Sequence, residues 1–310
     1  MPILLIGYNR PGMLKESLEY LVSVDARLYV ALDIPKPDDA INWELSRECQ
    51  EILGQFAAQI TDIRVSDQNQ GCFKGVTAAI TWAFTHEEAI IILEDDVRID
   101  EKFLAFSTQM LGKYMSEDRI GSVAATNLVP MHAISDPDSA YRLSAFTSSW
   151  GWATWRNRWE DYLEDLETFP YFDHTFPEGF WSFLSKRYWD RVFLETLNGR
   201  FDAWDYRWLY SNWKNSRLTI VPNSNLALNV GFGADATHTK DLISPWWLPT
   251  EISKEFLPKN GLKNLNRDVL ADLWMSHNHF RNKLAHQVRG AFATSFPRVS
   301  GYYRKTLKRN

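Results

Sequence analysis

An apolar run that ends in three consecutive carboxylates constrains this chain more than any other stretch. The run covers residues 89–93, and Glu94, Asp95 and Asp96 follow it directly. Isoleucine and leucine in unbroken succession are typical of a strand covered on both faces, as in a parallel sheet with helices on each side. Because ionised carboxylates are costly to bury, we expect the three acids at the carboxyl end of the strand, where open α/β sheets bind ligands.

The three acids can serve two purposes. Side chains alternate along an extended backbone, so Glu94 and Asp96 are predicted on one side and Asp95 on the other. A divalent cation beside a nucleotide diphosphate is commonly held by one or two carboxylates, with phosphate oxygens and water as its other ligands. The same acids could instead form a solvated turn before the next helix, which begins near Asp100 and Glu101. The pattern therefore predicts a metal-binding edge or a plain acidic turn.

The first 126 residues alternate strands and helices. Strands are predicted over residues 2–7, 27–33, 60–65, 89–97 and 120–126, with a further strand over 141–145, and helices over 12–22, 39–56, 74–85 and 101–115. This order predicts an α/β fold with a mostly parallel, doubly wound sheet and helices on both faces. The turns lack GxGxxG and GxxxxGK[ST], which disfavours a dinucleotide-binding loop or a phosphate loop of those kinds.

Most of the fourteen tryptophans lie in the second half of the chain. Tryptophan has a large apolar face and a polar edge, which suits stacking on sugar rings, but most of these side chains are expected to belong to the core. Beyond Asp272 the chain contains eight Lys and Arg residues and no acidic residue. Because the net charge of the whole chain is −5, residues 1–272 have a net charge of −5 − 8 = −13.

The basic tail could lie on an anionic membrane surface or pack its apolar side on the body of the protein. Binding of nucleic acid is disfavoured, because the acidic body would repel phosphate. Only two cysteines are present, no apolar run approaches the ~20 residues of a membrane span, and the first residues do not form a signal segment. We therefore expect a cytoplasmic protein, with possible peripheral contact to the inner face of the membrane.

A set of ordered motifs over residues 2–240 resembles the GT-A-fold, nucleotide-sugar-dependent glycosyltransferases, in particular the inverting N-acetylglucosaminyltransferase I family and its bacterial relatives. The motifs are the first strand with Arg10, the second strand ending at Asp33, the acid run at 94–96, the segment 201–208 around Trp204-Asp205, and the glycine-rich loop 231–238. The resemblance implies a GT-A domain whose nucleotide-sugar-binding half is 1–126 and whose acceptor-side half is 127–266, followed by a basic amphipathic tail, 267–310.

The resemblance also implies roles for individual residues. Arg10 would contact the nucleotide, and Asp33 would bind the uracil base. Glu94 and Asp95 would contact the ribose and the sugar, and Asp96 would bind Mn²⁺ or Mg²⁺. His238 would approach the metal or the diphosphate, and Asp205 would abstract the proton. Asp205 precedes the apolar helical positions 208, 209 and 213, so a helix N-terminus would hold it at the rim of the crevice. Asp202 is the alternative base, and either acid could simply cap a helix.

We therefore predict an inverting, metal-dependent transferase that moves a sugar from a UDP-sugar, with UDP-GlcNAc as the best guess. The acceptor would be a glycan or lipid-linked glycan, in the synthesis of a cell-surface polysaccharide or glycan. A nucleotidyltransferase that makes a nucleotide sugar is the first alternative, although it normally needs a glycine-rich loop with a basic residue after the first strand. A non-catalytic carbohydrate-binding protein is the second, and it leaves the three adjacent acids unexplained.

Overall fold

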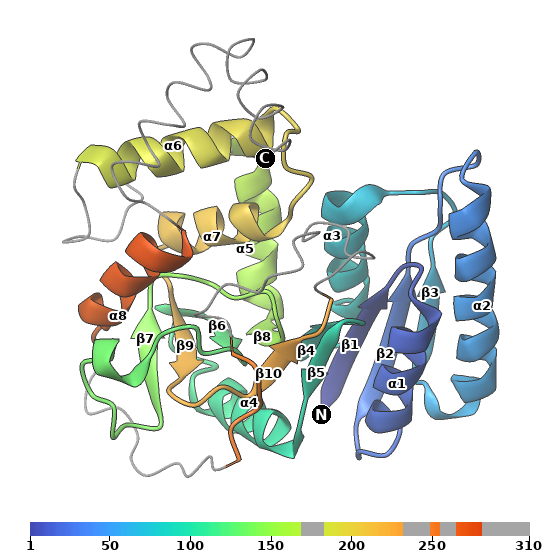
Figure 1. Ribbon diagram of the computed structural model, residues 1–310, viewed down its shortest axis with the longest axis horizontal. Coiled ribbons are helices and arrows are strands. Elements are labelled where there is room, and N and C mark those ends of the chain that lie inside the picture. The colour runs from blue at the N-terminus through green and yellow to red at the C-terminus, as the bar shows by residue number, and fades with distance from the viewer. Residues whose placement is uncertain (169–182, 232–248, 255–264, 281–310) are drawn as a thin grey trace, which may run out of the picture.

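The computed structural model describes residues 1–168, 183–231, 249–254 and 265–280 (Figure 1). The strands are β1 (Pro2–Gly7), β2 (Arg27–Leu32), β3 (Asp62–Val65), β4 (Ala89–Glu94), β5 (Val97–Ile99), β6 (Ile120–Ala124), β7 (Tyr141–Ser144), β8 (Trp152–Trp155), β9 (Leu218–Pro222) and β10 (Ala227–Asn229). The helices are α1 (Pro11–Leu21), α2 (Ala40–Phe56), α3 (Gly71–Ala83), α4 (Glu101–Lys113), α5 (Arg156–Thr168), α6 (Phe183–Leu197), α7 (Asp205–Lys214) and α8 (Val269–Trp274). A π-helical turn, Met275–His279, continues α8, and short 3-10 turns lie at Ala57–Gln59 and Met131–Ala133.

Eight of the described strands form one sheet in the order β3-β2-β1-β4-β8-β6-β9-β7. Parallel pairing joins β3, β2, β1 and β4, and it also joins β6 to β9. The antiparallel strand β8 lies between β4 and β6, and the antiparallel strand β7 closes the edge beside β9. The predicted fold class is confirmed, because the sheet is mostly parallel and α/β in character.

Helices cover both faces of the sheet, as successive residues of β1 demonstrate. Ile3 and Leu5 pack in one core cluster with the apolar sides of α1, α2 and α4, whereas Leu4 packs in a second cluster with α3, α5 and α7. A strand buried on both faces cannot alternate apolar and polar residues, which explains why β1 and β4 are almost uniformly aliphatic. The doubly wound arrangement expected from the sequence is therefore present.

The tryptophan-rich half contributes mainly to the core. Trp152 is 1% exposed and stacks on Trp204 with ring centroids 5.1 Å apart, and Trp159 and Trp208 pack against it. Seven tryptophans are buried within the described part of the chain, in line with the core role expected for most of them. The sequence did not reveal that Trp152 begins a strand, β8, whose partners β4 and β6 flank it on either side.

Several predicted boundaries differ from the structure, among them the end of β4, which is Glu94, and the start of α3. The helix expected from residue 74 begins at Gly71, because carboxylates from distant parts of the chain accept hydrogen bonds from the backbone N–H groups at its start. Within the described residues, no helix is both long enough and apolar enough to cross a membrane.

The aromatic cluster gives a stability prediction. Trp152→Ala should lower the free energy of unfolding by about 3–5 kcal/mol, because the cavity left in a rigid aromatic core cannot close. Urea denaturation followed by circular dichroism measures this change. The control is Trp43→Ala on α2, where the indole is only partly buried, and a loss of about 1 kcal/mol is expected there. Equal losses for the two variants would contradict a core role for Trp152.

Candidate functional site

The candidate site lies at the carboxyl ends of β1 and β4. These strands are neighbours at the centre of the sheet, and the chain continues from β1 through α1 to β2 on the opposite side. A position where the strand order reverses in this way leaves a crevice between the loops that follow the two strands. Arg10 follows β1, and Asp95 and Asp96 follow β4, so the topology brings these three residues together.

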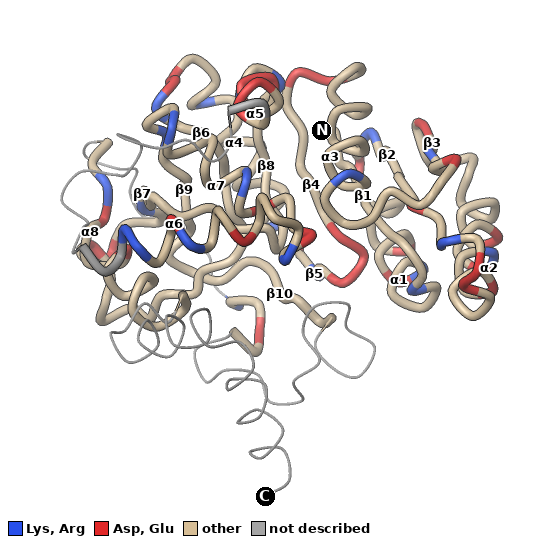
Figure 2. Tube along the Cα trace, turned by 90° about the horizontal axis from the view of Figure 1, so that it is seen from above, with Lys and Arg blue, Asp and Glu red and all other residues tan. Residues whose placement is uncertain are grey.

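Arg10 binds two of the three adjacent acids. Its guanidinium Nη2 lies 2.6 Å from Oδ1 of Asp95, and its Nη1 donates a hydrogen bond of 2.7 Å to Oδ2 of Asp96. Asp95 is 0% exposed, and its backbone carbonyl accepts a hydrogen bond from Nη1 of Arg98. Figure 2 shows the acidic run as a red stretch between β4 and β5. Arg10 therefore ties the turn after β1 to the end of β4.

The pKa values of Glu94 and Asp95 are both raised. Burial, together with the nearby charges of Asp96 and Asp95, raises the pKa of Glu94 to about 8. Burial likewise raises the pKa of Asp95 to about 7, and the positive charge of Arg10 opposes that rise. Each carboxyl therefore loses its proton less readily than in water, and an additional cation would favour the ionised forms.

A cavity of about 810 Å³ opens in front of this cluster. Glu94 and Asp96 both line it, whereas Asp95 lies in the interior behind them, as the alternation of the strand predicted. Its wall combines aliphatic side chains, such as those of Ile6, Leu32 and Val76, with aromatic, cationic and acidic ones. The aromatic, charged and amide side chains include Tyr8, Arg10, Asp33, Arg64, Asn69, Trp150, Arg200, Asp202, Trp204, Asp205, Tyr206 and Asn229.

The described residues fit a divalent cation in part. Oδ1 of Asp96 is buried and has no hydrogen-bond partner in the described chain, so it is available as a ligand. A Cβ at Gly231 would lie 2.1 Å from Oδ2 of the same carboxylate, so only glycine allows this close approach. No group of three or more His, Cys, Asp or Glu side chains that could hold a metal occurs among the described residues. A cation at Asp96 would therefore take most of its ligands from a substrate and water.

Two of the sequence-predicted site residues bind the start of α3. The carboxylate of Asp33 accepts hydrogen bonds from the backbone N–H groups of Gln70 and Gly71 at 3.1 Å. The carboxylate of Asp202 accepts from Cys72 and Phe73 at 3.0 and 3.1 Å. Both acids line the cavity, but each already uses its oxygens to satisfy the exposed N–H groups of a helix N-terminus. The capping alternative considered for Asp202 is thus present in the structure.

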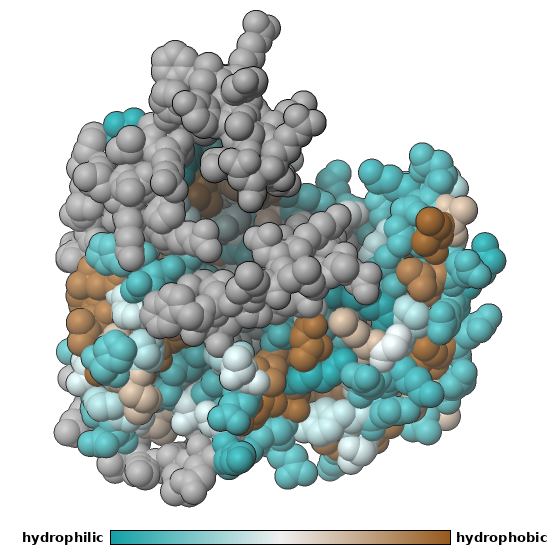
Figure 3. Space-filling model, in the orientation of Figure 1, coloured by the Kyte–Doolittle hydropathy of each residue, from teal (hydrophilic) through white to brown (hydrophobic). Residues whose placement is uncertain are grey.

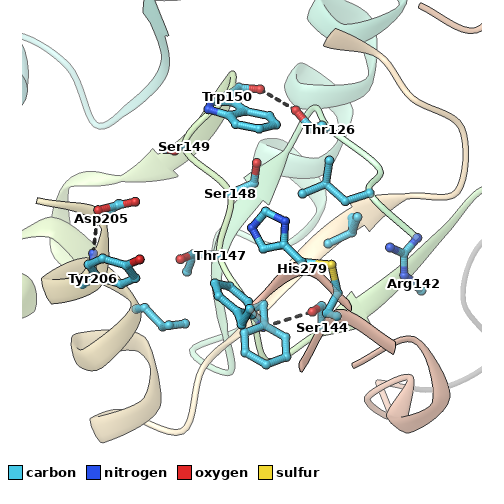
Figure 4. A pocket seen from close by; sticks show the side chains of 16 residues that line it. Thr126, Arg142, Ser144, Thr147, Ser148, Ser149, Trp150, Asp205, Tyr206 and His279 are labelled. Atoms are coloured by element: carbon cyan, nitrogen blue, oxygen red, sulfur yellow. Dashed lines mark hydrogen bonds between the residues drawn. The ribbon is translucent and has the colours of Figure 1, made fainter. Parts of the chain in front are cut away.

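Asp205 lies where two cavities meet. It is the first residue of α7, and Trp204, which precedes it, is held by stacking on Trp152. The second cavity, about 160 Å³, is shown in Figure 4 with Asp205 at its edge. Asp205 lines both cavities, as do Tyr206, Ser149 and Trp150. Asp205 is therefore a wall residue of two cavities, and its Oδ1 accepts a hydrogen bond from the backbone N–H of Tyr206.

Hydroxyl groups and aromatic rings make up most of the second cavity's wall. They belong to Thr126, Ser144, Phe146, Thr147, Ser148, Ser149, Trp150, Tyr206 and Phe280. His279 also lines it, and burial lowers the pKa of this imidazole to about 4, so the ring is neutral near pH 7. Asp205 is the only acidic side chain among the lining residues, all of which belong to the described chain.

Sequence reasoning missed several lining residues. Tyr8 directly follows β1 and Arg64 is the next-to-last residue of β3, so their positions near the carboxyl ends of parallel strands could have identified them. Trp150 lines both cavities, and nothing in its local sequence distinguishes it from the tryptophans of the core. His279 lines the second cavity together with Asp205, and no local sequence signal indicates that position. His238, predicted as a metal or diphosphate contact, lies outside the described residues.

No family model matches the sequence, and no curated protein matches it. Among solved structures, the chain is similar to residues 1–349 of TarS from S. aureus in complex with UDP-GlcNAc, at 14% identity and a TM-score of 0.43, covering 73% of this chain and 57% of that one. It is also similar to mannose-1-phosphate geranyltransferase from Thermus thermophilus, at 11% identity and a TM-score of 0.39, covering 75% of this chain and 77% of that one.

A third similar structure is UDP-glucose pyrophosphorylase complexed with UDP-glucose, at 9% identity and a TM-score of 0.37, covering 72% of this chain and 90% of that one. The match spans less than two thirds of the length of the TarS structure. Each of these likenesses concerns the fold alone.

The cap on α3 can be tested by removing a single carboxylate. Asp202→Ala should lower the free energy of unfolding by about 1 kcal/mol, because two backbone N–H groups lose their acceptor. Urea denaturation measures the loss. Asp138→Ala, at an exposed acid, is the control and should change stability by less than about 0.5 kcal/mol. An Asp202→Ala variant as stable as the wild type would show that the cap contributes nothing.

The raised pKa values predict a pH dependence of stability in the presence of a chelator. Between pH 5 and 8 the folded protein holds protons on Glu94 and Asp95 that the unfolded chain has released, so the free energy of unfolding should fall as pH rises. Glu94→Gln should reduce this fall by about 1–2 kcal/mol, allowing for screening at the cavity mouth. Urea denaturation at a series of pH values gives the slope.

The exposed Glu101 provides the matched control, since Glu101→Gln should keep the wild-type slope. A Glu94→Gln slope equal to that of the wild type would contradict the assignment of the raised pKa to this residue.

Proposed function

We propose that the protein is an inverting, metal-dependent glycosyltransferase that moves a sugar from a UDP-sugar, UDP-GlcNAc being the first donor to test, to a glycan or lipid-linked glycan. The observation that carries the proposal is the position of Asp205, on the wall shared by two cavities of which one contains the acid cluster. A transferase needs such a group, because one base must face both the bound donor and the incoming acceptor.

The larger cavity suits the donor. Its volume of about 810 Å³ falls in the range of small-molecule and cofactor sites. Asp96 has a free oxygen for Mn²⁺ or Mg²⁺, and Arg10 lies beside it as a second positive group. When bound, the divalent cation neutralises the charge that develops on the departing diphosphate. Because Arg10 already pairs with Asp95 and Asp96, it orients the metal-binding carboxylate before substrate arrives.

The smaller cavity suits the acceptor. Hydroxyl side chains can exchange hydrogen bonds with sugar hydroxyls, and the ring of Trp150, which is only partly buried, offers an apolar face for the sugar. In the proposed reaction an acceptor hydroxyl oxygen forms a bond to the anomeric carbon as the bond from that carbon to the diphosphate oxygen breaks. Asp205 takes the hydroxyl proton, and the nucleoside diphosphate leaves with the bonding electrons. Attack from the face opposite the diphosphate inverts the anomeric carbon.

Calorimetric titration with UDP and UDP-GlcNAc, with and without Mn²⁺, tests the donor site. Binding should depend on the metal, and Asp96→Ala should weaken it at least about tenfold, because the cation loses its protein ligand. Asp205→Asn should bind the donor normally and release UDP from UDP-GlcNAc at least about 100-fold more slowly. Asp202→Asn separates the two candidate bases, and its UDP release should fall less than about tenfold.

Other results would select an alternative. Loss of turnover in Asp202→Asn with retention in Asp205→Asn would make Asp202 the base. Conversion of UTP and GlcNAc-1-phosphate to UDP-GlcNAc with release of pyrophosphate would favour the nucleotidyltransferase. Absence of nucleotide binding under every metal condition would contradict the proposal and favour a carbohydrate-binding protein.

A further inference from the structure

Arg142 is a cation enclosed in the wall of the second cavity. It lies on β7 and is 5% exposed. Ser144, two positions further along the strand, lines the same cavity, whereas the intervening Leu143 packs in the hydrophobic core, in keeping with the alternation of side chains on a strand. Charged side chains normally remain in water, and hydrophilic residues predominate on the outer side of α2 in Figure 3. Burial lowers the pKa of Arg142 to about 10, so the guanidinium is still positively charged near pH 7.

The hydrogen-bond partners of Arg142 are all uncharged. Nη1 donates to Oδ1 of Asn223 at 3.0 Å and to the carbonyl of Pro222 at 3.3 Å, and Nη2 donates to Oδ1 of Asn127 at 2.9 Å. Two amide side chains therefore hold the plane of the guanidinium. Nε is buried and has no hydrogen-bond partner in the described chain, and Nη2 uses only one of its two N–H groups there.

The charge of Arg142 has no counter-ion within the described residues. The two acids whose charge acts on it are Asp268 and Asp272, and both have other partners. Asp268 caps the start of α8, and Asp272 accepts a hydrogen bond from Ser144 and lies 3.4 Å from Nε of Arg267. A buried charge without a counter-ion is costly, so an anion that entered the cavity would offset part of that cost.

Arg142 and Asp205 lie at opposite sides of the view in Figure 4, with Ser148 and His279 between them. Among the described residues that line this cavity, Arg142 is the only lysine or arginine and Asp205 is the only acid. An anionic group is attracted to the first and repelled by the second. A molecule bound through such a group would therefore direct its opposite end towards Asp205.

We infer that Arg142 forms an anion-binding subsite in the second cavity, for a carboxylate or phosphate group on a sugar. The N–H groups that lack acceptors, on Nε and Nη2, can donate to two oxygens of that group, which is the geometry that guanidinium favours. The next step rests on the proposed function. If Asp205 is the base that activates the acceptor, the anionic group belongs to the acceptor, and the acceptor is an acidic rather than a neutral glycan.

Binding of three matched sugars to the full chain tests the subsite, in EDTA and without nucleotide. Methyl glucoside is compared with its analogues that have a carboxylate or a phosphate at the sixth carbon, and NMR titration of the ¹⁵N-labelled protein gives each Kd. At least one acidic sugar should bind at least about tenfold more tightly than the neutral one, because it adds charge-assisted hydrogen bonds. The tighter of the two acidic sugars identifies the anionic group.

Substitution of the arginine locates the binding. Arg142→Met should reduce the preference for the acidic sugar to less than about twofold, and Arg142→Lys, which keeps a charge but not the paired N–H groups, should give an intermediate preference. Arg158→Met is the matched control, because Arg158 is also buried, at 0% exposure, and lines neither cavity. This variant should lose stability and keep the wild-type preference.

Three results would overturn the proposal: equal binding of acidic and neutral sugars by the wild type, binding of none of them, or an unchanged preference in Arg142→Met. If circular dichroism shows Arg142→Met unfolded, the wild type decides. The acidic sugar should shift the Nε–H signal of Arg142, which is identified by its absence from Arg142→Lys, and an unshifted signal would contradict the subsite. Because the titration uses no donor, its failure would leave the glycosyltransferase proposal intact, and normal turnover by Asp205→Asn would leave the subsite intact.

Discussion

The ion pairs of Arg10 with Asp95 and Asp96 are the interaction on which the rest of the site depends. Three carboxylates in succession at the end of a buried strand repel one another, and burial adds to the cost of ionising them. Arg10 supplies the compensating charge from the turn after β1, the neighbouring strand. This contact fixes the two strand ends that border the larger cavity. It engages one oxygen of Asp96 and leaves the other, Oδ1, without a partner in the described chain.

The start of α3 joins the two halves of the chain. Asp33, at the end of β2, and Asp202, in the loop before α7, both accept hydrogen bonds from its first backbone N–H groups. Asp202 lies three residues before Asp205, so the cap connects the start of α3 to the loop that leads into α7. A helix N-terminus is well suited to this purpose, because its unpaired N–H groups and positive dipole both favour a carboxylate.

The aromatic second half gives the two cavities rigid walls. Trp152 stacks on Trp204 and thereby holds the residue next to Asp205, while Trp150, two positions earlier, lines both cavities. The turn that continues α8 and Phe280 after it complete the wall of the second cavity, to which Met275, His279 and Phe280 belong.

The sequence by itself determined the β-α alternation of the first half, the acids at the carboxyl end of β4 and the helix that begins at Asp205, because each depends on the order of neighbouring residues. Only the tertiary structure decided where α3 begins, since its caps come from residues 38 and 130 positions away. It also placed β8 between β4 and β6 and brought His279 to the cavity beside Asp205. These features depend on contacts between distant segments, which no local periodicity encodes.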